Sequence, residues 1–257
     1  MPRADRNDHP AEASDLGGVA DLLWRTGADR REDARPRLNA RRIVAAAVGI
    51  ADAEGLDVVS MQRVASELGY TTTALYRHIP SKEHLVAAMV DTATGSPPSP
   101  SSGPRVWRTE VELWVLALWN LYLRRPWMMR APTLSAPVGP NELAWFEALL
   151  SPLARAGLDR TELVPIATFI SSAVRDLARV ATELDPAGAA AYHQVLGQRL
   201  NPEHFPVLCS LAAGDGLDEE EDGDVTPIVR YGIERLLDGI EVRLESTTKH
   251  PKEKRDE

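Results

Sequence analysis

The stretch Ser60–Pro80, SMQRVASELGYTTTALYRHIP, constrains the fold more than any other part of the chain. Apolar residues recur at helical spacing in its first half, a glycine interrupts them, and the same spacing resumes in its second half. The small Ala65 lets a second helix cross the first, Gly69 allows a tight turn, and Leu75 fills the angle between the helices. The stretch therefore predicts a helix-turn-helix.

Helices are also predicted on both sides of this motif. An alanine-rich helix with one apolar face precedes it and ends at Gly55, and another helix follows Pro80. Side-chain oxygens that accept from free backbone N–H groups mark the start of each helix. The expected caps, in chain order, are Asn39, Ser60, Thr71 or Thr72, and Ser81.

The remainder of the chain also has helical periodicity, and strand alternation is absent from nearly all of it. A Gly-, Ser- and Pro-rich string at 94–104 separates two parts of the protein. The fold class is predicted to be all-α, with an N-terminal three-helix helix-turn-helix domain linked to a larger helical domain. The later helices are expected at 105–125, 141–157, 161–184 and 226–244, with two shorter ones within 187–213, and Asn141 is the expected cap of the second.

These patterns divide the chain into four parts. Residues 1–36 are expected to be mostly disordered, although the apolar cluster Leu22–Trp24 allows a short helix. An arginine-bearing arm of this kind can reach a DNA minor groove, and it can equally be a solvated leader. The helix-turn-helix domain is expected at 37–94, the larger helical domain at 105–246, and a disordered tail at 247–257.

Composition limits the class of protein. The chain has 257 residues, 44% of them hydrophobic and 26% charged, which is ordinary for a soluble globular protein. Its longest apolar run, Val111–Leu123, is too short to span a bilayer, and no signal peptide is visible. The single Cys209 excludes an intrachain disulfide and a multi-cysteine metal cluster. We therefore expect a cytoplasmic protein without a membrane segment, a metal or a cofactor.

The formal net charge of −9 does not exclude a nucleic-acid partner. Six acids fall within 218–224, far from the helix-turn-helix, whereas arginines outnumber acids between Arg30 and Arg42. The acidic run resembles the first half of a calcium loop, but Val229 stands where the last acidic ligand is needed. We interpret it as a solvated loop.

Residues 39–90, NARRIVAAAVGIADAEGLDVVSMQRVASELGYTTTALYRHIPSKEHLVAAMV, resemble the N-terminal DNA-binding domain of the tetracycline-repressor (TetR) family. The shared features are the alanine-rich first helix, AEGLD, ASELG at the turn, and LYRHIPSKEHL. Two later segments, VWRTEVELWVLALWNLYLRRPW and GPNELAWFEALLSPLARAGL, resemble that family's tetracycline-repressor-type C-terminal domain less specifically. The resemblance implies a homodimer with a ligand pocket in each C-terminal domain, from which a bound effector shifts the reading heads and releases the operator.

The second helix of the motif carries the side chains that a major groove requires. Its N-terminus offers threonine hydroxyls, and longer groups follow one turn later. By resemblance, Tyr76 and Lys82 match positions that hold the DNA backbone, and Thr72, Thr73 and Arg77 match positions that face base edges. His78 is as easily explained by packing. The candidate DNA-contacting residues are Arg63, Thr71, Thr72, Thr73, Tyr76, Arg77, His78 and Lys82.

Tryptophans mark the candidate effector pocket, although a helical core presents the same residues. Trp107 and Trp114 are seven residues apart and share a helix face with Leu118. On the tetracycline-repressor template, Trp114 and Leu118 fall at ligand-contacting positions, and a tryptophan in place of the expected polar residue favours a more apolar ligand than tetracycline. The candidate pocket residues are Trp107, Trp114, Leu118, Phe146, Phe169 and Arg175.

The resemblance also places a dimer interface on the helices at 161–184 and 226–244, and a palindromic operator would require such coupled heads. Catalytic motifs are missing: the sequence has no His-Glu-x-x-His, no phosphate-binding glycine loop and no Gly-x-Ser-x-Gly elbow. We expect a ligand-responsive repressor of palindromic double-stranded operator DNA. The alternatives are a constitutive DNA-binding dimer and a small-molecule carrier or enzyme with an incidental helix-turn-helix.

Overall fold

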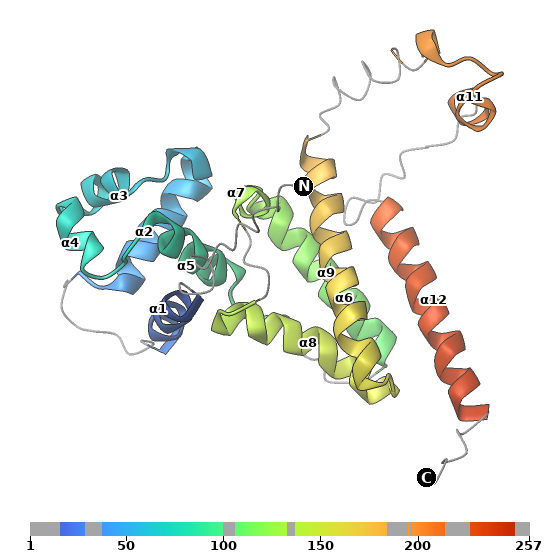
Figure 1. Cartoon of the computed structure of the whole chain (residues 1–257), viewed down its shortest axis with the longest axis horizontal. Coiled ribbons are helices and arrows are strands. Elements are labelled where there is room, and N and C mark those ends of the chain that lie inside the picture. Colours follow the sequence, from blue (N-terminus) through green and yellow to red (C-terminus); the bar gives the residue numbers. More distant parts are fainter. Residues whose placement is uncertain are drawn as a thin grey trace, which may run out of the picture. The chain divides into compact units, whose positions relative to one another are not determined.

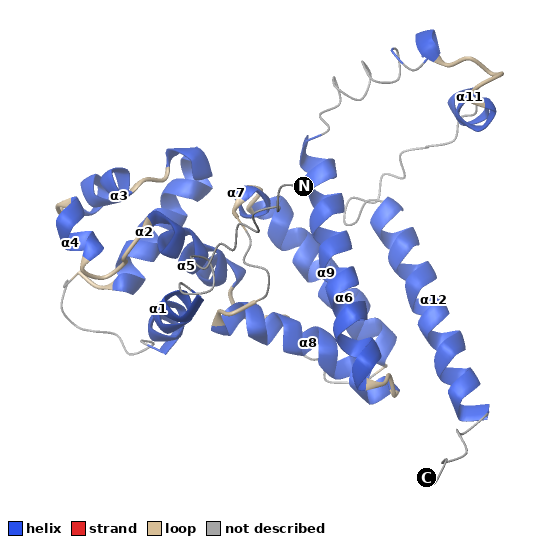
Figure 2. Ribbon diagram, in the orientation of Figure 1, coloured by secondary structure: helices blue, strands red, loops and turns tan. Residues whose placement is uncertain are grey.

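The computed structural model describes residues 16–28, 38–99, 106–132, 137–183, 195, 197–213 and 227–249. Helices and short connections account for all of these residues, as the all-α prediction requires (Figure 2). The chain divides into two compact units, one made of Met1–Ser102 with Trp127–Ser151 and the other of Gly103–Pro126 with Pro152–Glu257. None of the described helices is long and apolar enough to cross a membrane.

The first unit contains the helix-turn-helix and the helices that support it (Figure 1). Helix α2 packs against α3 and α5, and α4 packs on α3 at the far end of the motif. The bounds, in chain order, are α1 Leu16–Ala28, α2 Ala40–Glu54, the 3-10 helix η1 Leu56–Val58, α3 Met61–Leu68, α4 Thr72–Tyr76, α5 Lys82–Thr94 and α7 Trp127–Arg130. Helix α8, Pro140–Ala156, begins in this unit and ends in the second.

Short-range hydrogen bonds fix the ends of the motif as its sequence predicts. The side-chain oxygens of Asn39 and Ser60 accept from backbone N–H groups of the following helices, at 2.8 and 3.0 Å. Thr71, rather than Thr72, does the same for α4 at 3.3 Å. Gly69 has a φ of 72°, a left-handed conformation that glycine adopts without the Cβ clash of other residues. The turn therefore has its predicted cause.

Apolar residues from all the α-helices of the first unit form its core. Ala65 at the crossing and Leu75 in the angle between the helices are buried, as the motif demands. Helix α5 contributes a wide apolar surface, which packs against both α2 and α1. The fully buried large residues of this core are Leu22, Leu23, Ile43, Leu75, Ile79, Leu85, Met89 and Leu149.

Helix α1 lies within the extension that the sequence led us to expect as mostly disordered. Its residues Val19, Leu22 and Leu23 are buried, and α1 packs against α5 and, over a smaller area, α2. Residues 16–28 form the helix that the apolar cluster Leu22–Trp24 allowed, and one apolar face of this helix is covered by α5. The rest of 1–36 and the tail from 250 onward lie outside the described residues.

The described residues of the second unit include three long helices, the short helix α11 and the end of α8. Helix α6, Trp107–Arg124, packs against α9, Arg160–Glu183, and α12, Pro227–Lys249, packs against α9 (Figure 1). Helix α11, Pro206–Ala213, belongs to the predicted region of shorter helices. The core of this unit includes Trp119, Leu153, Ile170 and Leu237, all with less than 2% of their surface exposed.

Two features of α8 differ from the sequence-based expectation. Asn141 was expected to cap this helix, but the helix begins at Pro140, and the N–H groups of Asn141 and Glu142 donate to the carboxylate of Asp91. Residues 127–151, expected in the C-terminal domain, cluster instead with the helix-turn-helix. Both differences follow from long-range hydrogen bonds, which local sequence patterns do not encode.

Candidate functional site

Helix α4 presents the candidate DNA-reading side chains on the face opposite the core. Leu75 and Ile79 are fully buried, and they hold α4 and the turn after it against the rest of the unit. Thr73, Tyr76 and Arg77 are exposed, with 49% of Tyr76 accessible. A hydroxyl, a phenol and a guanidinium thus point away from the core within two helical turns, which suits contacts with phosphates and base edges.

The other candidates on this face divide into a cap, two half-buried residues and a lysine. The Thr71 side chain accepts from Ala74 N–H, so its hydroxyl oxygen already serves α4. Thr72 and His78 are half-buried. Lys82 is exposed at the first residue of α5.

Lys82 shares its helix end with a carboxylate. The Ser81 hydroxyl hydrogen-bonds Glu83 and lowers the pKa of that carboxyl, so Glu83 is ionised beside the lysine. An exposed anion at the N-terminus of α5 stabilises the helix. It also weakens the attraction of this end for phosphate, which leaves Lys82 to supply the positive charge.

Arg63 on the supporting helix is engaged with two carboxylates of its own chain. Its guanidinium lies 2.7 Å from Glu67 on the next turn of α3 and 2.7 Å from Glu54 at the end of α2. The hydrogen bonds to Glu67 and then Glu54 raise the pKa of Arg63. A DNA contact by Arg63 would therefore have to compete with these two ion pairs, which the sequence did not reveal.

The candidate effector residues come together only in part. Trp114 and Leu118 are buried on α6, with 3% and 7% of their surface exposed. Trp107, seven residues before Trp114 on the same helix, is half-buried. Arg175 on α9 is half-buried in the same unit. Phe169, also on α9, is 60% exposed, so its side chain lies on the surface of the chain rather than in its core.

Phe146 belongs to a different unit from the other candidates. It lies in the part of α8 that clusters with the helix-turn-helix, and it is half-buried there. Of the candidate pocket residues in the second unit, Trp107, Trp114 and Leu118 lie on α6, and Arg175 lies on α9.

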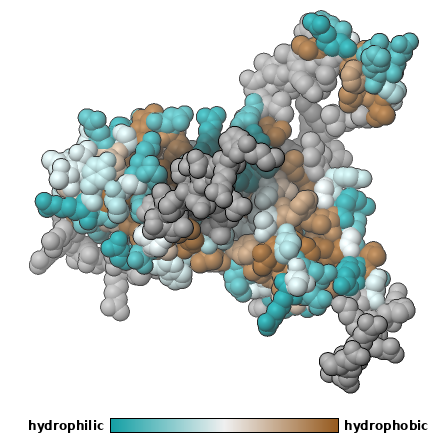
Figure 3. Space-filling view, in the orientation of Figure 1, coloured by the Kyte–Doolittle hydropathy of each residue, from teal (hydrophilic) through white to brown (hydrophobic). Residues whose placement is uncertain are grey.

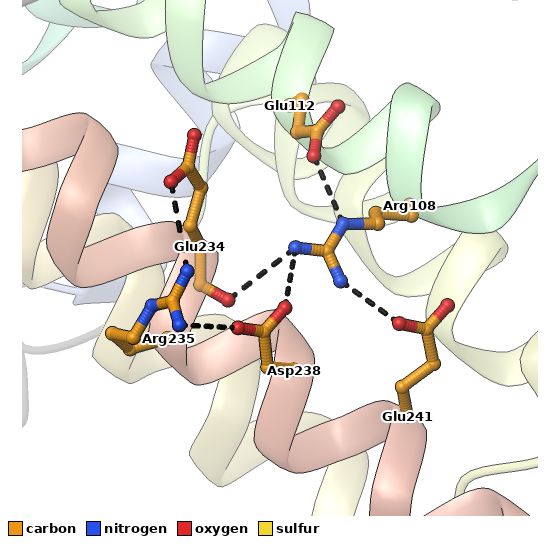
Figure 4. Close-up of polar contacts among 6 residues, drawn as sticks. All are labelled: Arg108, Glu112, Glu234, Arg235, Asp238 and Glu241. Atoms are coloured by element: carbon orange, nitrogen blue, oxygen red, sulfur yellow. Dashed lines mark hydrogen bonds and ion pairs between the residues drawn. The ribbon is translucent and has the colours of Figure 1, made fainter.

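A cluster of ion pairs ties α6 to α12 in the second unit (Figure 4). The guanidinium of Arg108 lies 2.7 Å from Asp238, 2.9 Å from Glu241 and 3.2 Å from Glu112. Asp238 also pairs with Arg235 at 3.1 Å. The hydrogen bond to Asp238 is the main cause that raises the pKa of Arg108. This cluster, called the Arg108 cluster below, fixes α12 beside the helix that carries Trp114.

Large apolar side chains remain exposed on α9 and α12, the two helices expected at a dimer interface. Tyr231 and Val242 on α12 are exposed by 66% and 65%, and Val164, Phe169 and Val180 on α9 by 53%, 60% and 40%. Figure 3 shows hydrophobic residues exposed among hydrophilic ones on the face of the molecule that it draws. Exposed apolar side chains on adjacent helices are typical of a surface that another protein covers.

Comparison with known proteins agrees with this arrangement. The family model "Bacterial regulatory proteins, tetR family" matches residues 43–89, and "Tetracyclin repressor-like, C-terminal domain" matches residues 99–244. The HTH-type transcriptional repressor DrrR1 of Streptomyces coeruleorubidus is 32% identical over 241 residues, which cover 90% of this chain and 87% of that protein. The chain belongs to the TetR family. It is therefore a transcriptional regulator of that family rather than an enzyme.

Solved structures of TetR-family proteins share its fold. The ActR protein of Streptomyces coelicolor in complex with actinorhodin is 26% identical, with a TM-score of 0.68 over 81% of this chain and 99% of that one. The ActR complex with (S)-DNPA is 27% identical, with a TM-score of 0.67 over 79% and 97%. Both structures show ActR with a small molecule bound.

The burial and partners of some polar residues in this TetR-family chain were not predicted from the sequence. Asp91 and His84 are buried with 2% and 4% of their surface exposed, although both lie on a helix whose pattern reads as ordinarily amphipathic. The Trp127 ring N–H donates to Asp52 at 2.7 Å across 75 residues of sequence. A carboxylate in the otherwise apolar string LVAAMVDTA was the available signal for Asp91.

Proposed function

We propose that the protein is a dimeric repressor that binds a palindromic operator through α4 and is released from it by a small, largely apolar effector. The observation that carries the DNA-binding half is the exposed set Thr73, Tyr76 and Arg77 above the buried Leu75. Because two coupled heads read two half-sites, the half-sites would lie about 34 Å apart or at a multiple of that distance.

The buried aromatic residues of α6 support an effector of low polarity. Trp114 and Leu118 offer a flat, apolar surface, and the polar groups beside them in the sequence are few. ActR, which is similar to this chain over most of its length, was crystallised with actinorhodin and with (S)-DNPA. Aromatic compounds of this kind are therefore the first probes to test.

The dimer would form through α9 and α12. Phe169 and Tyr231 are among the most exposed large apolar side chains of the described residues, and neither has a role in the core of the single chain. Covering such side chains removes apolar surface from water. Phe169→Ser should shift the protein toward monomer in sedimentation equilibrium, whereas Trp24→Ser, at an equally exposed aromatic on α1, should leave the dimer intact.

The whole proposal is tested by titrating a labelled duplex from upstream of the protein's own gene. Actinorhodin is then added to the complex, and its binding is followed separately by quenching of tryptophan fluorescence. We expect specific, salt-dependent binding of the duplex and its release by the compound. A duplex that stays bound while actinorhodin and other apolar aromatic compounds quench no tryptophan would favour the constitutive regulator.

The contact assignment has its own test. Arg77→Ala should weaken binding of the specific duplex by about tenfold or more, because a guanidinium on a base edge or phosphate contributes about 1–3 kcal/mol. Arg124→Ala is the matched control, since Arg124 is an exposed arginine on α6, outside the unit that holds α4. Equal affinities for the two variants would show that Arg77 is not a contact.

A further inference from the structure

Part-buried hydrogen bonds join the last turn of α5 and Gly95, which follows it, to the first turns of α8 at two points, one helical turn apart. At one point, the Asp91 carboxylate accepts from the N–H groups of Asn141 at 2.9 Å and Glu142 at 3.0 Å, and from the Asn141 side-chain amide at 3.0 Å. At the other, the Trp145 ring N–H donates to the Gly95 carbonyl at 3.0 Å. Two separate attachments prevent α8 from rotating about either one.

The Asp91 carboxylate is the cap of α8, supplied from another helix. The first N–H groups of a helix have no partner within it, and the positive end of the helix dipole favours an anion there. Burial raises the pKa of Asp91, whereas the three hydrogen bonds from Asn141 and Glu142 act in the opposite direction. Removing the carboxylate would take away the acceptor of two part-buried backbone N–H groups.

Gly139 shows how closely α8 approaches this carboxylate. A Cβ atom at Gly139 would lie 2.1 Å from Asp91 Oδ1 and 2.4 Å from its Cγ. Gly139 is itself buried. The chain therefore needs glycine at this position so that the backbone before α8 can reach the anion.

A third attachment holds α7 to the same unit. The Trp127 ring N–H donates to Asp52 in the last turn of α2, and α7 packs against the 3-10 helix η1 that follows α2. Trp127 is buried, with 5% of its surface exposed. Residues 127–151 thus meet the DNA-reading unit through α2 at one end and α5 at the other.

Prolines flank the second stretch of this unit, Trp127–Ser151, on both sides. The first unit takes up the chain again at Trp127, directly after Pro126, and ends at Ser151, directly before Pro152 inside α8. Proline has no N–H for the carbonyl of the preceding turn, and its ring disturbs the helix at that point. The rigid attachments therefore stop where the helix is weakest.

We propose that Asp91, Trp145 and Trp127 are positioning residues that make α7 and residues 140–151 of α8 a rigid extension of the DNA-reading helices. Any displacement of this segment then moves α4, and DNA bound at α4 restrains this segment. The inference deepens the proposed function, because release of an operator by an effector requires a displacement to reach α4.

Hydrogen exchange with and without the operator duplex tests the proposal, and it needs no effector. In the wild-type protein, the duplex should slow exchange severalfold in residues 141–151 as well as in 61–76. In Asp91→Ala, the slowing should persist in 61–76 and fall below twofold in 141–151. Asp91→Asn keeps an oxygen for the two backbone N–H groups and should behave as the wild type.

Slowing in 141–151 that is equal in Asp91→Ala and wild type, or absent from both, would overturn the proposal. Should Asp91→Ala fail to fold, Trp145→Phe, which removes one N–H and little else, replaces it with the same expected loss. If the duplex binds but no effector releases it, the proposed function is wrong. The hydrogen-exchange comparison still tests the present proposal, because it uses no effector. A protein that binds no duplex is judged by free-state exchange, where Asp91→Ala must speed 141–151 and spare 107–124.

Discussion

The hydrogen bonds between Asp91 and the start of α8, called the Asp91 joint below, and those of the Arg108 cluster are similar in kind but differ in their exposure to water. Asp91 is one buried carboxylate with three N–H donors, and 2% of its surface is exposed. Arg108 is one guanidinium with three carboxylates, and its partners have 41–50% of their side chains exposed. Water competes for every bond of the second and for almost none of the first, so removing Asp91 should cost far more than removing Arg108.

Of the substitutions that compare these two regions, Gly139→Ala should lower the free energy of unfolding the most. The new methyl group would force the Asp91 carboxylate or the start of α8 to move, and overpacking of this kind costs about 1–3 kcal/mol on top of the lost hydrogen bonds. The free energy of unfolding in urea measures the loss. Gly49→Ala is the control, because a Cβ at Gly49 meets nothing within 4 Å. A Gly139→Ala protein as stable as Gly49→Ala would contradict the close packing at the joint.

Asp91→Ala should lower the free energy of unfolding by about 2 kcal/mol, since it removes a helix cap and the acceptor of two part-buried N–H groups. Urea unfolding again provides the measurement. Asp238→Ala removes a carboxylate from the Arg108 cluster and serves as the comparison. If the two losses were equal, burial would not be the property that separates the two regions.

The pH dependence of stability should also separate Asp91 from a surface carboxylate. Burial raises the pKa of Asp91 in the folded protein above its ordinary value of 3.8. Between these two values the folded state binds more protons than the unfolded state, so this group's contribution to stability falls as the pH rises through that window. Unfolding midpoints of wild type minus Asp91→Asn, measured across the window, should decline with pH. A rising difference would contradict the sign.

Arg108→Ala should have the smallest effect, at about 0–1 kcal/mol, because partly exposed ion pairs are screened by water and salt. Its loss should shrink further when the salt concentration is raised from about 0.1 to 1 M, as the Debye length falls from about 10 to 3 Å. The loss caused by Asp91→Ala should hardly change over the same range. Urea unfolding at the two salt concentrations compares them directly.

The sequence predicted best what depends on neighbouring residues. Asn39, Ser60 and Ser81 cap their helices, and Gly69 makes the turn, because each acts within four residues along the chain. The cap of α8 was assigned to Asn141 and comes from Asp91, 50 residues away. The exposed set on α4 followed from periodicity. The ion pairs of Arg63 did not, since one partner, Glu54, lies on another helix.

The effector site was the hardest part to predict from sequence. Trp114 and Leu118 are buried as a pocket would require, but burial is also what any core tryptophan shows. Phe169 was among the candidate pocket residues, and 60% of its surface is exposed. Which face of a helix is covered depends on the helices beside it, and that information is not local to the sequence.

Helix α1 has a practical consequence for studying this protein in pieces. The family match begins at residue 43, and a shortened protein started there would lack the three buried side chains that α1 lays on α5. The strip of α5 thus bared would be free to bind other molecules of the shortened protein. Self-association of such a fragment would reflect apolar surface that α1 normally covers. The dimer should therefore be measured on a protein that includes α1.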